Sequence, residues 1–135
     1  MTVGAFSPSR LQIEPDDMEE THYQSILEKQ LAMNRQTWAA LQDHGATEQS
    51  ELRLDFSFNA PDRKAADRLY ALLQEQTDYE VKIVSGGPFL LRKWRVEGTT
   101  RNTSISPAIL DQWVTWMVTA GKESGCDFDG WGTSV

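Results

Sequence analysis

Apolar residues follow a helical period in the first third of the chain. Between residues 18 and 45, large apolar side chains recur every three or four positions, which places them along one stripe of a helix. The stripe consists of Ile26, Leu27, Leu31, Trp38 and Leu41. Acidic residues occupy the first turn, where the helix dipole favours them, and Gly45 can adopt the left-handed conformation that ends a helix. The pattern predicts a helix over residues 18–45, after an arm of residues 1–17 that lacks a hydrophobic period and that we expect to be flexible.

The period then changes to two, which is typical of strands with one buried and one polar face. In the clearest strand, Leu52, Leu54, Phe56 and Phe58 alternate with Arg53, Asp55, Ser57 and Asn59. Further strands are predicted at residues 79–83, at residues 89–97 and from about residue 127. The turn signal at residues 85–88, Ser-Gly-Gly-Pro, joins the second and third strands into a hairpin.

Two further helices are predicted between these strands. The segment 59–62, Asn-Ala-Pro-Asp, supplies a cap and a proline for the first of them, which should run to about Gln76. Ser106 and Pro107 open the second, which should end at Gly121 or Gly125. We expect an apolar stripe of this helix in the core, and its members are Ile109, Trp113, Trp116, Met117 and Ala120.

The order of elements predicts an α+β fold. Strand, helix, strand, strand, helix, strand gives the ferredoxin-like βαββαβ sandwich, whose four-stranded antiparallel sheet carries both helices on one face. An extra N-terminal helix precedes it. A chain of 135 residues fits one domain, which we place at residues 18–135, with the ferredoxin-like part at residues 51–135. In this topology the first strand lies between the third and the last.

The other face of the sheet is predicted to be open. If Phe128 points into the core, alternation turns three residues of the last strand outward, namely Asp127, Asp129 and Trp131. Arg53 and Asp55 of the first strand join them. Arg95 does so if Leu90, Trp94 and Val96 of the third strand point inward, although a shift of one residue would invert that strand.

Three interpretations of this face stay open. It is a solvated surface with weak ion pairs, a partner-binding surface around Trp131, or a surface that the N-terminal helix covers. Trp131 is then either the centre of a partner-binding face or the residue against which the helix closes. The six candidate partner-binding residues are Trp131, Asp129, Asp127, Arg53, Asp55 and Arg95.

Charge and composition narrow the class of partner. The net charge is −7, and residues 1–50 hold three basic and eight acidic side chains. An acidic chain is a poor candidate for direct nucleic-acid binding, so we expect a protein partner. No apolar run reaches the roughly 20 residues that a membrane helix needs, and the N-terminus has no signal-peptide pattern, which favours a cytoplasmic protein without membrane contact.

The candidate chemistry is sparse. Cys126 is the single cysteine, and His22 and His44 are the only histidines, so the sequence favours neither a metal site nor a nucleophile–histidine pair. Asp127 and Asp129 on an exposed strand would keep ordinary acidity rather than act as an acid–base pair. We therefore expect no enzyme activity, no metal and no cofactor.

The last strand carries a family resemblance. Residues 127–133, Asp-Phe-Asp-Gly-Trp-Gly-Thr, resemble the terminal strand of the B-type regulators of ribonuclease E activity, the RraB family. Residues 35–45, with Arg-Gln-Thr at their start and glycine at their end, resemble the helix of that family, and Tyr79-Glu80-Val81 resembles its second strand. The likeness covers about residues 22–135.

This resemblance implies a bacterial, ferredoxin-like protein that binds ribonuclease E or another RNA-decay component and lowers its activity without catalysis of its own. The expected mechanism is occlusion by protein–protein contact, with Trp131 as the anchor. The alternative is a ferredoxin-like small-molecule sensor or an oligomerising domain, such as a homodimer, without a ribonuclease target.

Overall fold

The computed structural model describes residues 15–88 and 92–133, with side chains from residue 18 onward. The elements, in chain order, are α1 (Pro15–Asp43), β1 (Glu51–Leu52), β2 (Asp55–Ala60), α2 (Arg63–Gln76), β3 (Glu80–Gly86), β4 (Lys93–Thr99), β5 (Thr103–Ser104), α3 (Pro107–Ser124) and β6 (Asp127–Gly132). The expected flexible arm lies almost entirely outside the described residues, as does Leu90.

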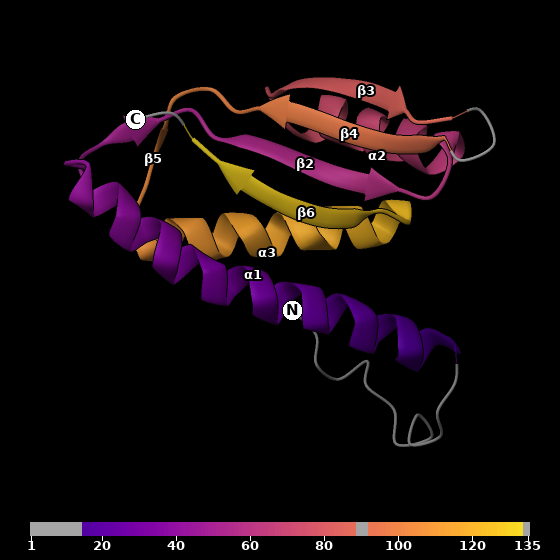
Figure 1. Ribbon diagram of the computed structural model, residues 1–135, viewed down its shortest axis with the longest axis horizontal. Coiled ribbons are helices and arrows are strands. Elements are labelled where there is room, and N and C mark those ends of the chain that lie inside the picture. Colours follow the sequence, from indigo (N-terminus) through magenta and orange to yellow (C-terminus); the bar gives the residue numbers. More distant parts are fainter. Residues whose placement is uncertain (1–14, 89–91, 134–135) are drawn as a thin grey trace.

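The main sheet has the predicted order of strands. All its pairs are antiparallel, and its order is β3-β4-β2-β6, which places the first strand between the third and the last. Helices α2 and α3 cover one face (Figure 1). The ferredoxin-like α+β fold is therefore confirmed. In a second, two-stranded sheet, β1 pairs with β5, so the segment before β2 lies beside the segment before α3.

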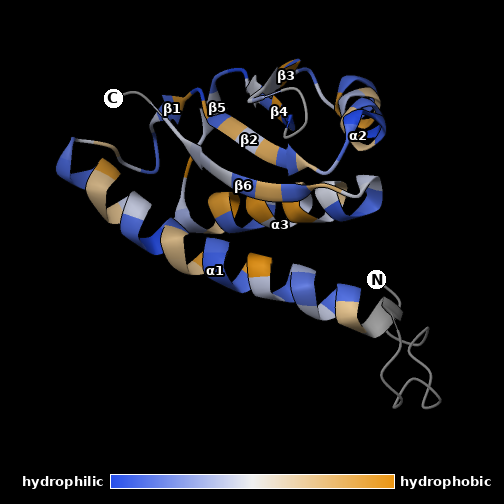
Figure 2. Cartoon of the chain, turned by 45° about the vertical axis from the view of Figure 1, so that its right-hand side comes forward, coloured by the Kyte–Doolittle hydropathy of each residue, from blue (hydrophilic) through white to orange (hydrophobic). Residues whose placement is uncertain are grey.

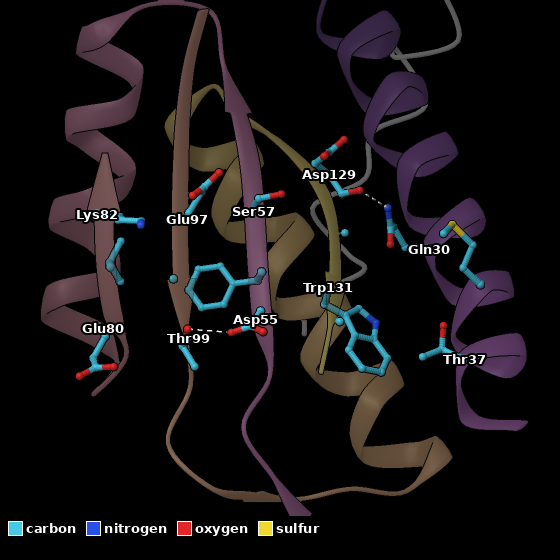
Figure 3. Close-up of a pocket in the computed structure, with 16 residues that line it drawn as sticks. Gln30, Thr37, Asp55, Ser57, Glu80, Lys82, Glu97, Thr99, Asp129 and Trp131 are labelled. Carbon is cyan, nitrogen blue, oxygen red and sulfur yellow. Dashed lines mark hydrogen bonds between the residues drawn. The ribbon is translucent and has the colours of Figure 1, made fainter. Parts of the chain in front are cut away.

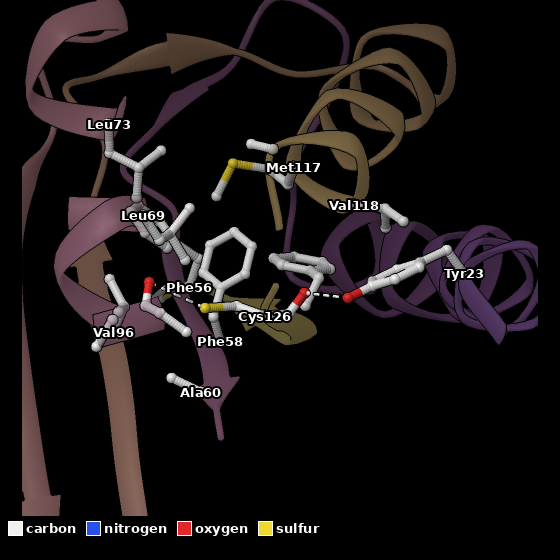
Figure 4. Close-up of a cluster of buried hydrophobic side chains, with 14 of the residues drawn as sticks. Tyr23, Phe56, Phe58, Ala60, Leu69, Leu73, Val96, Met117, Val118 and Cys126 are labelled. Carbon is white, nitrogen blue, oxygen red and sulfur yellow. Dashed lines mark hydrogen bonds between the residues drawn. The ribbon is translucent and has the colours of Figure 1, made fainter. Parts of the chain in front are cut away.

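The core lies between the sheet and the two helices. Phe58 of β2, Leu69 and Leu73 of α2, Val96 of β4 and Met117 of α3 are fully buried in it (Figure 4). A second, smaller cluster ties α1 to the rest of the chain, and its buried members are Leu41, Leu54, Ile105 and Leu110. The alternating pattern of β2 is the direct cause of this arrangement, because every second side chain faces the helices.

Helix α1 lies beside the sheet rather than over its open face. It runs along α3 and the edge strand β6 (Figures 1 and 2). An edge strand exposes unpaired backbone groups, and covering it with a helix is one way to protect it. The opposite edge is β3.

The predicted helix boundaries match the structure closely. Asp62 caps α2 by accepting a hydrogen bond from the Ala65 amide at 2.8 Å, and Ser106 caps α3 through the Ile109 amide at 3.2 Å. Gly125 ends α3 with φ of 83°, and Gly45 follows α1 with φ of 95°. Helix α1 itself begins at Pro15 and ends at Asp43, slightly earlier than predicted at both ends.

Two of the predicted patterns needed correction. The single strand over residues 52–59 is divided in two, because Leu52 pairs with Thr103 of β5 before the main strand starts at Asp55. The buried stripe of α3 is also rotated from the predicted one. Ile109 and Trp116 are 40% and 37% exposed, and their places in the core belong to Leu110, Val114 and Val118.

The facing of β4 agrees with the preferred interpretation. Val96 is fully buried and Trp94 packs against the core, so Arg95 points to the open face. No helix in the described part of the chain is both long and apolar enough to cross a membrane.

Candidate partner-binding face

A β-bulge in β6 controls which residues reach the open face. Phe128 pairs with Phe58, but the next paired residue, Gly130, is opposite Ser57, so Asp129 is an extra residue in the ladder. Gly130 has φ of 145°, which L-residues rarely adopt. The extra residue changes the alternation, so Phe128 and Trp131 both point to the helix side of the sheet.

The predicted outward facing of Trp131 was therefore wrong. Its pairing partner Phe56 is a core residue, and its ring packs edge-on against Trp113 of α3 at 6.1 Å between centroids. The indole Nε1 donates a hydrogen bond of 2.8 Å to Oδ1 of Asn34 in α1. The prediction assumed that the side chains of the last strand alternate strictly between the two faces, and the bulge breaks this alternation. The second interpretation of Trp131, as the residue against which the N-terminal helix closes, describes what the structure shows.

A row of polar contacts joins α1 to β6 and α3. Asn34 is only 2% exposed and donates to Asp111 of α3 at 3.0 Å, while it accepts from Trp131. Gln30 donates to the backbone oxygen of Asp129 at 3.3 Å, and Tyr23 to that of Cys126 at 3.2 Å. The bonds from Gln30 and Tyr23 satisfy backbone oxygens of β6 and of Cys126, the residue before it. Together these contacts hold α1 in place.

Asp127 lies at the far end of this row. Its carboxylate contacts Nε2 of His22 at 3.1 Å. Burial, followed by the nearby Asp127 charge, raises the pKa of Tyr23 to about 12. The structure therefore places Asp127 next to α1 rather than among the other candidate residues.

Arg95 and Asp129 are brought together on the open face. Arg95 donates from Nη2 to Ser57 Oγ at 2.9 Å and from Nε to Glu97 Oε2 at 3.2 Å, and the same Nη2 lies 3.7 Å from Asp129 Oδ2. Asn59 also donates to Asp129 at 3.2 Å. Asp129 is the extra residue of the bulge, and its carboxylate joins this network on the open face.

Arg53 and Asp55 lie towards the other end of the face. Asp55 accepts a hydrogen bond of 2.8 Å from the Thr99 hydroxyl, a neutral donor. Arg53 extends across the sheet to Glu80 of β3 at 3.0 Å, and Arg101 approaches the same carboxylate at 4.0 Å. Four of the six candidate residues, Arg53, Asp55, Arg95 and Asp129, thus lie on or next to the open face. Asp127 lies beside α1, and Trp131 supports the face from behind.

A groove of about 770 Å³ runs over this face (Figure 3). Helix α1 forms one wall through Gln30, Met33 and Thr37. The sheet supplies the rest of the lining, namely Asp55, Phe56, Ser57, Glu80, Val81, Lys82, Glu97, Gly98, Thr99, Asp129, Gly130, Trp131 and Gly132.

The sequence interpretation missed the α1 wall of this groove. Gln30, Met33 and Thr37 are spaced by three and four, so they share one side of the helix. That spacing was readable, but it gave no sign that this side would border the open face. Thr99 was missed because the third strand was predicted to end at residue 97, whereas β4 ends at Thr99. Glu80 and Lys82 were missed because the facing of the second strand was not predicted.

The described residues show little that is equipped for covalent or metal chemistry. Cys126 is fully buried, and burial raises the pKa of its thiol to about 11, so the nucleophilic thiolate is scarce near neutral pH. Within residues 15–88 and 92–133, no group of three or more His, Cys, Asp or Glu side chains is placed to hold a metal ion. The site is a polar groove lined by charged side chains, which suits binding.

These features define a ferredoxin-like domain with a helix along one edge of its sheet and a polar groove on the open face. The family described as regulator of ribonuclease activity B matches residues 31–133, and the chain belongs to that family. Among curated proteins, none matches this chain. Membership implies a role in the regulation of ribonuclease activity.

Proposed function

We propose that this protein is a cytoplasmic regulator that binds ribonuclease E, or another component of RNA decay, and lowers its activity by occlusion. Family membership supports the regulatory role. The partner-binding surface in this proposal is the open face of the sheet around Asp55, Arg95 and Asp129. Arg53 and Asp127 flank it, and Trp131 anchors α1 beside it.

The single observation that carries the surface assignment is the position of α1. A helix that could have covered the open face instead runs along the β6 edge and forms only one wall of the groove. The face therefore keeps a solvent-accessible surface with groups fixed by hydrogen bonds, such as Arg95 and Asp129. Groups held in place before binding lose less conformational entropy when a partner docks.

A binding and cleavage experiment tests this proposal. Purified ribonuclease E is incubated with the immobilised chain, and cleavage of an RNA substrate is timed with and without the free chain. We expect retention of the enzyme and slower cleavage. Asp55→Arg should abolish both effects, because it reverses a charge in the lining of the groove.

Glu75→Arg is the matched control for that variant. It makes the same change of charge at an exposed position of α2, away from the open face. A wild-type chain that neither retains the enzyme nor slows cleavage would contradict the proposed function. Equal effects of the two variants would contradict the assigned surface.

A small-molecule sensor is the second candidate, and the groove volume is the observation that favours it. About 770 Å³ lies within the range of ligand sites. Such sites are mostly apolar and enclosed, whereas this groove is open and lined by four carboxylates, so we rank this function lower. A dose-dependent rise in melting temperature with a metabolite would reverse the order.

A further inference from the structure

The floor of the groove is hollowed where β6 carries glycines. Gly132 pairs with Asp55, so both residues face the groove, and no atom lies within 4 Å of the place where a Cβ on Gly132 would be. Gly130 has only the side-chain amide of Gln30 near that position, at 3.9 Å. The missing side chains leave room for a chain to lie between the α1 wall and the sheet.

The charges that line the groove are mostly negative. Asp55, Glu80, Glu97 and Asp129 contribute carboxylates, and Lys82 contributes the single cationic group of the lining. Arg95 offsets part of this charge from its place beside Glu97 and Asp129, and Arg53 and Arg101 pair with Glu80 at 3.0 and 4.0 Å. Asp55 has a neutral hydroxyl as its hydrogen-bond partner, so its charge remains available to an incoming cation.

The α1 side of the groove adds apolar surface next to these carboxylates. Met33 is 44% exposed on the wall, and the half-buried Trp131 borders it. Arginine and lysine bind to such mixed surfaces, because their aliphatic stems cover apolar atoms while their charged ends reach carboxylates.

We propose that the groove takes an extended segment of the partner protein that is rich in arginine and lysine. The inference rests on the proposed function and specifies its partner. Proteins that act on RNA use basic segments to neutralise phosphates, and a segment held in this groove would be withheld from RNA. The protein then competes with RNA for the basic segment, while its own net charge of −7 disfavours binding to the nucleic acid.

The test uses the full chain and a fluorescein-labelled peptide of about ten residues, a length typical of an extended strand, with arginine and serine alternating. Fluorescence anisotropy measures binding, and a peptide with glutamate in place of arginine is the reversed-charge control. We expect the arginine peptide to bind, with an affinity that falls as salt is added. The glutamate peptide should not bind.

Gly132→Lys is the blocking variant. Its ammonium group would lie beside Asp55 in the groove, where there is space, and we expect at least a tenfold loss of peptide affinity. Gly86→Lys is the matched control, because it adds the same side chain to β3 at a position that is also free of neighbours and outside the groove lining. It should bind the peptide like the wild type.

Equal losses in the two variants, or no loss in Gly132→Lys, would overturn the inference. Binding of ribonuclease E is measured on the same variants to separate it from the proposed function. If the wild type and Gly132→Lys both retain the enzyme, the groove is not the site of the basic segment and the regulatory function stands. If the wild type does not bind the enzyme, the proposed function fails whatever the peptide does.

Discussion

At the scale of single residues, Trp131 and Asn34 form the most consequential pair. Trp131 offers one hydrogen-bond donor, and Asn34 uses its oxygen for that donor and its nitrogen for Asp111. The pair therefore connects β6, α1 and α3 through one buried amide. A buried polar group has to be hydrogen-bonded, so this small network fixes how α1 sits beside the groove.

Trp131→Phe should lower the free energy of unfolding by about 1–3 kcal/mol, because it leaves the Asn34 oxygen buried without its donor while an aromatic ring is kept. Urea unfolding followed by circular dichroism measures the change. Trp116→Phe, at an exposed position of α3, should stay within about 0.5 kcal/mol of the wild type. A loss as large at Trp116 as at Trp131 would argue against the hydrogen bond as the cause.

At the scale of elements, the bulge in β6 does two things at once. It turns Trp131 to the helix side, where α1 can bind it, and it lets Asp129 lean into the network on the open face. Both results depend on one extra residue followed by a glycine in a conformation that other residues avoid. The bulge thus links the position of α1 to the layout of the groove.

Gly130→Ala should therefore destabilise the protein by about 1–3 kcal/mol, since alanine is strained at φ of 145°. Gly132→Ala is the control within the same strand, because that position needs no positive φ and has no neighbour within 4 Å. Its stability should match the wild type or exceed it slightly. The two melting temperatures decide the matter, and equal values would refute the strained conformation of Gly130.

At the scale of the whole molecule, stability depends on the packing of α1 against the ferredoxin-like part. Tyr23 and Cys126 meet at this contact, where the Tyr23 hydroxyl donates to the Cys126 backbone oxygen. Burial is the largest cause of the raised pKa of both side chains, from 10.0 to about 12 for Tyr23 and from 9.0 to about 11 for Cys126. Both groups therefore hold their protons more tightly in the folded state than in the unfolded state.

The expected consequence is a loss of stability in alkali. A raised folded-state pKa contributes stability that is fully present below the unfolded pKa and is lost as the pH rises through the folded one. The free energy of unfolding should fall between about pH 9 and pH 12, and Tyr23→Phe should make the upper part of this fall shallower. Urea titrations at several pH values measure it. Tyr70→Phe, which removes an exposed phenol, should keep the wild-type profile; a flatter profile in this control would contradict the assignment.

The open face shows how far sequence reasoning can reach. Asp55, Asp129 and Arg95 were placed on one face from the alternation of three strands, and the structure brings them onto it. Trp131 was misplaced, because an alternating pattern carries no mark of a bulge beyond the glycine itself. The contribution of α1 to the groove could not be predicted, since its wall residues are far from the strands in sequence.

The sequence by itself determined the three helices, the four strands of the main sheet, the order of these elements and most of the helix caps. Asp62, Ser106 and Gly125 cap helices through bonds to residues only a few positions away in the sequence. The alternation from Leu54 to Phe58 is likewise a local pattern with a fixed period. Only the tertiary structure decided the register of β6, the edge that α1 covers and the shape of the groove. These features depend on pairing and packing between distant segments, whose energies no local pattern records.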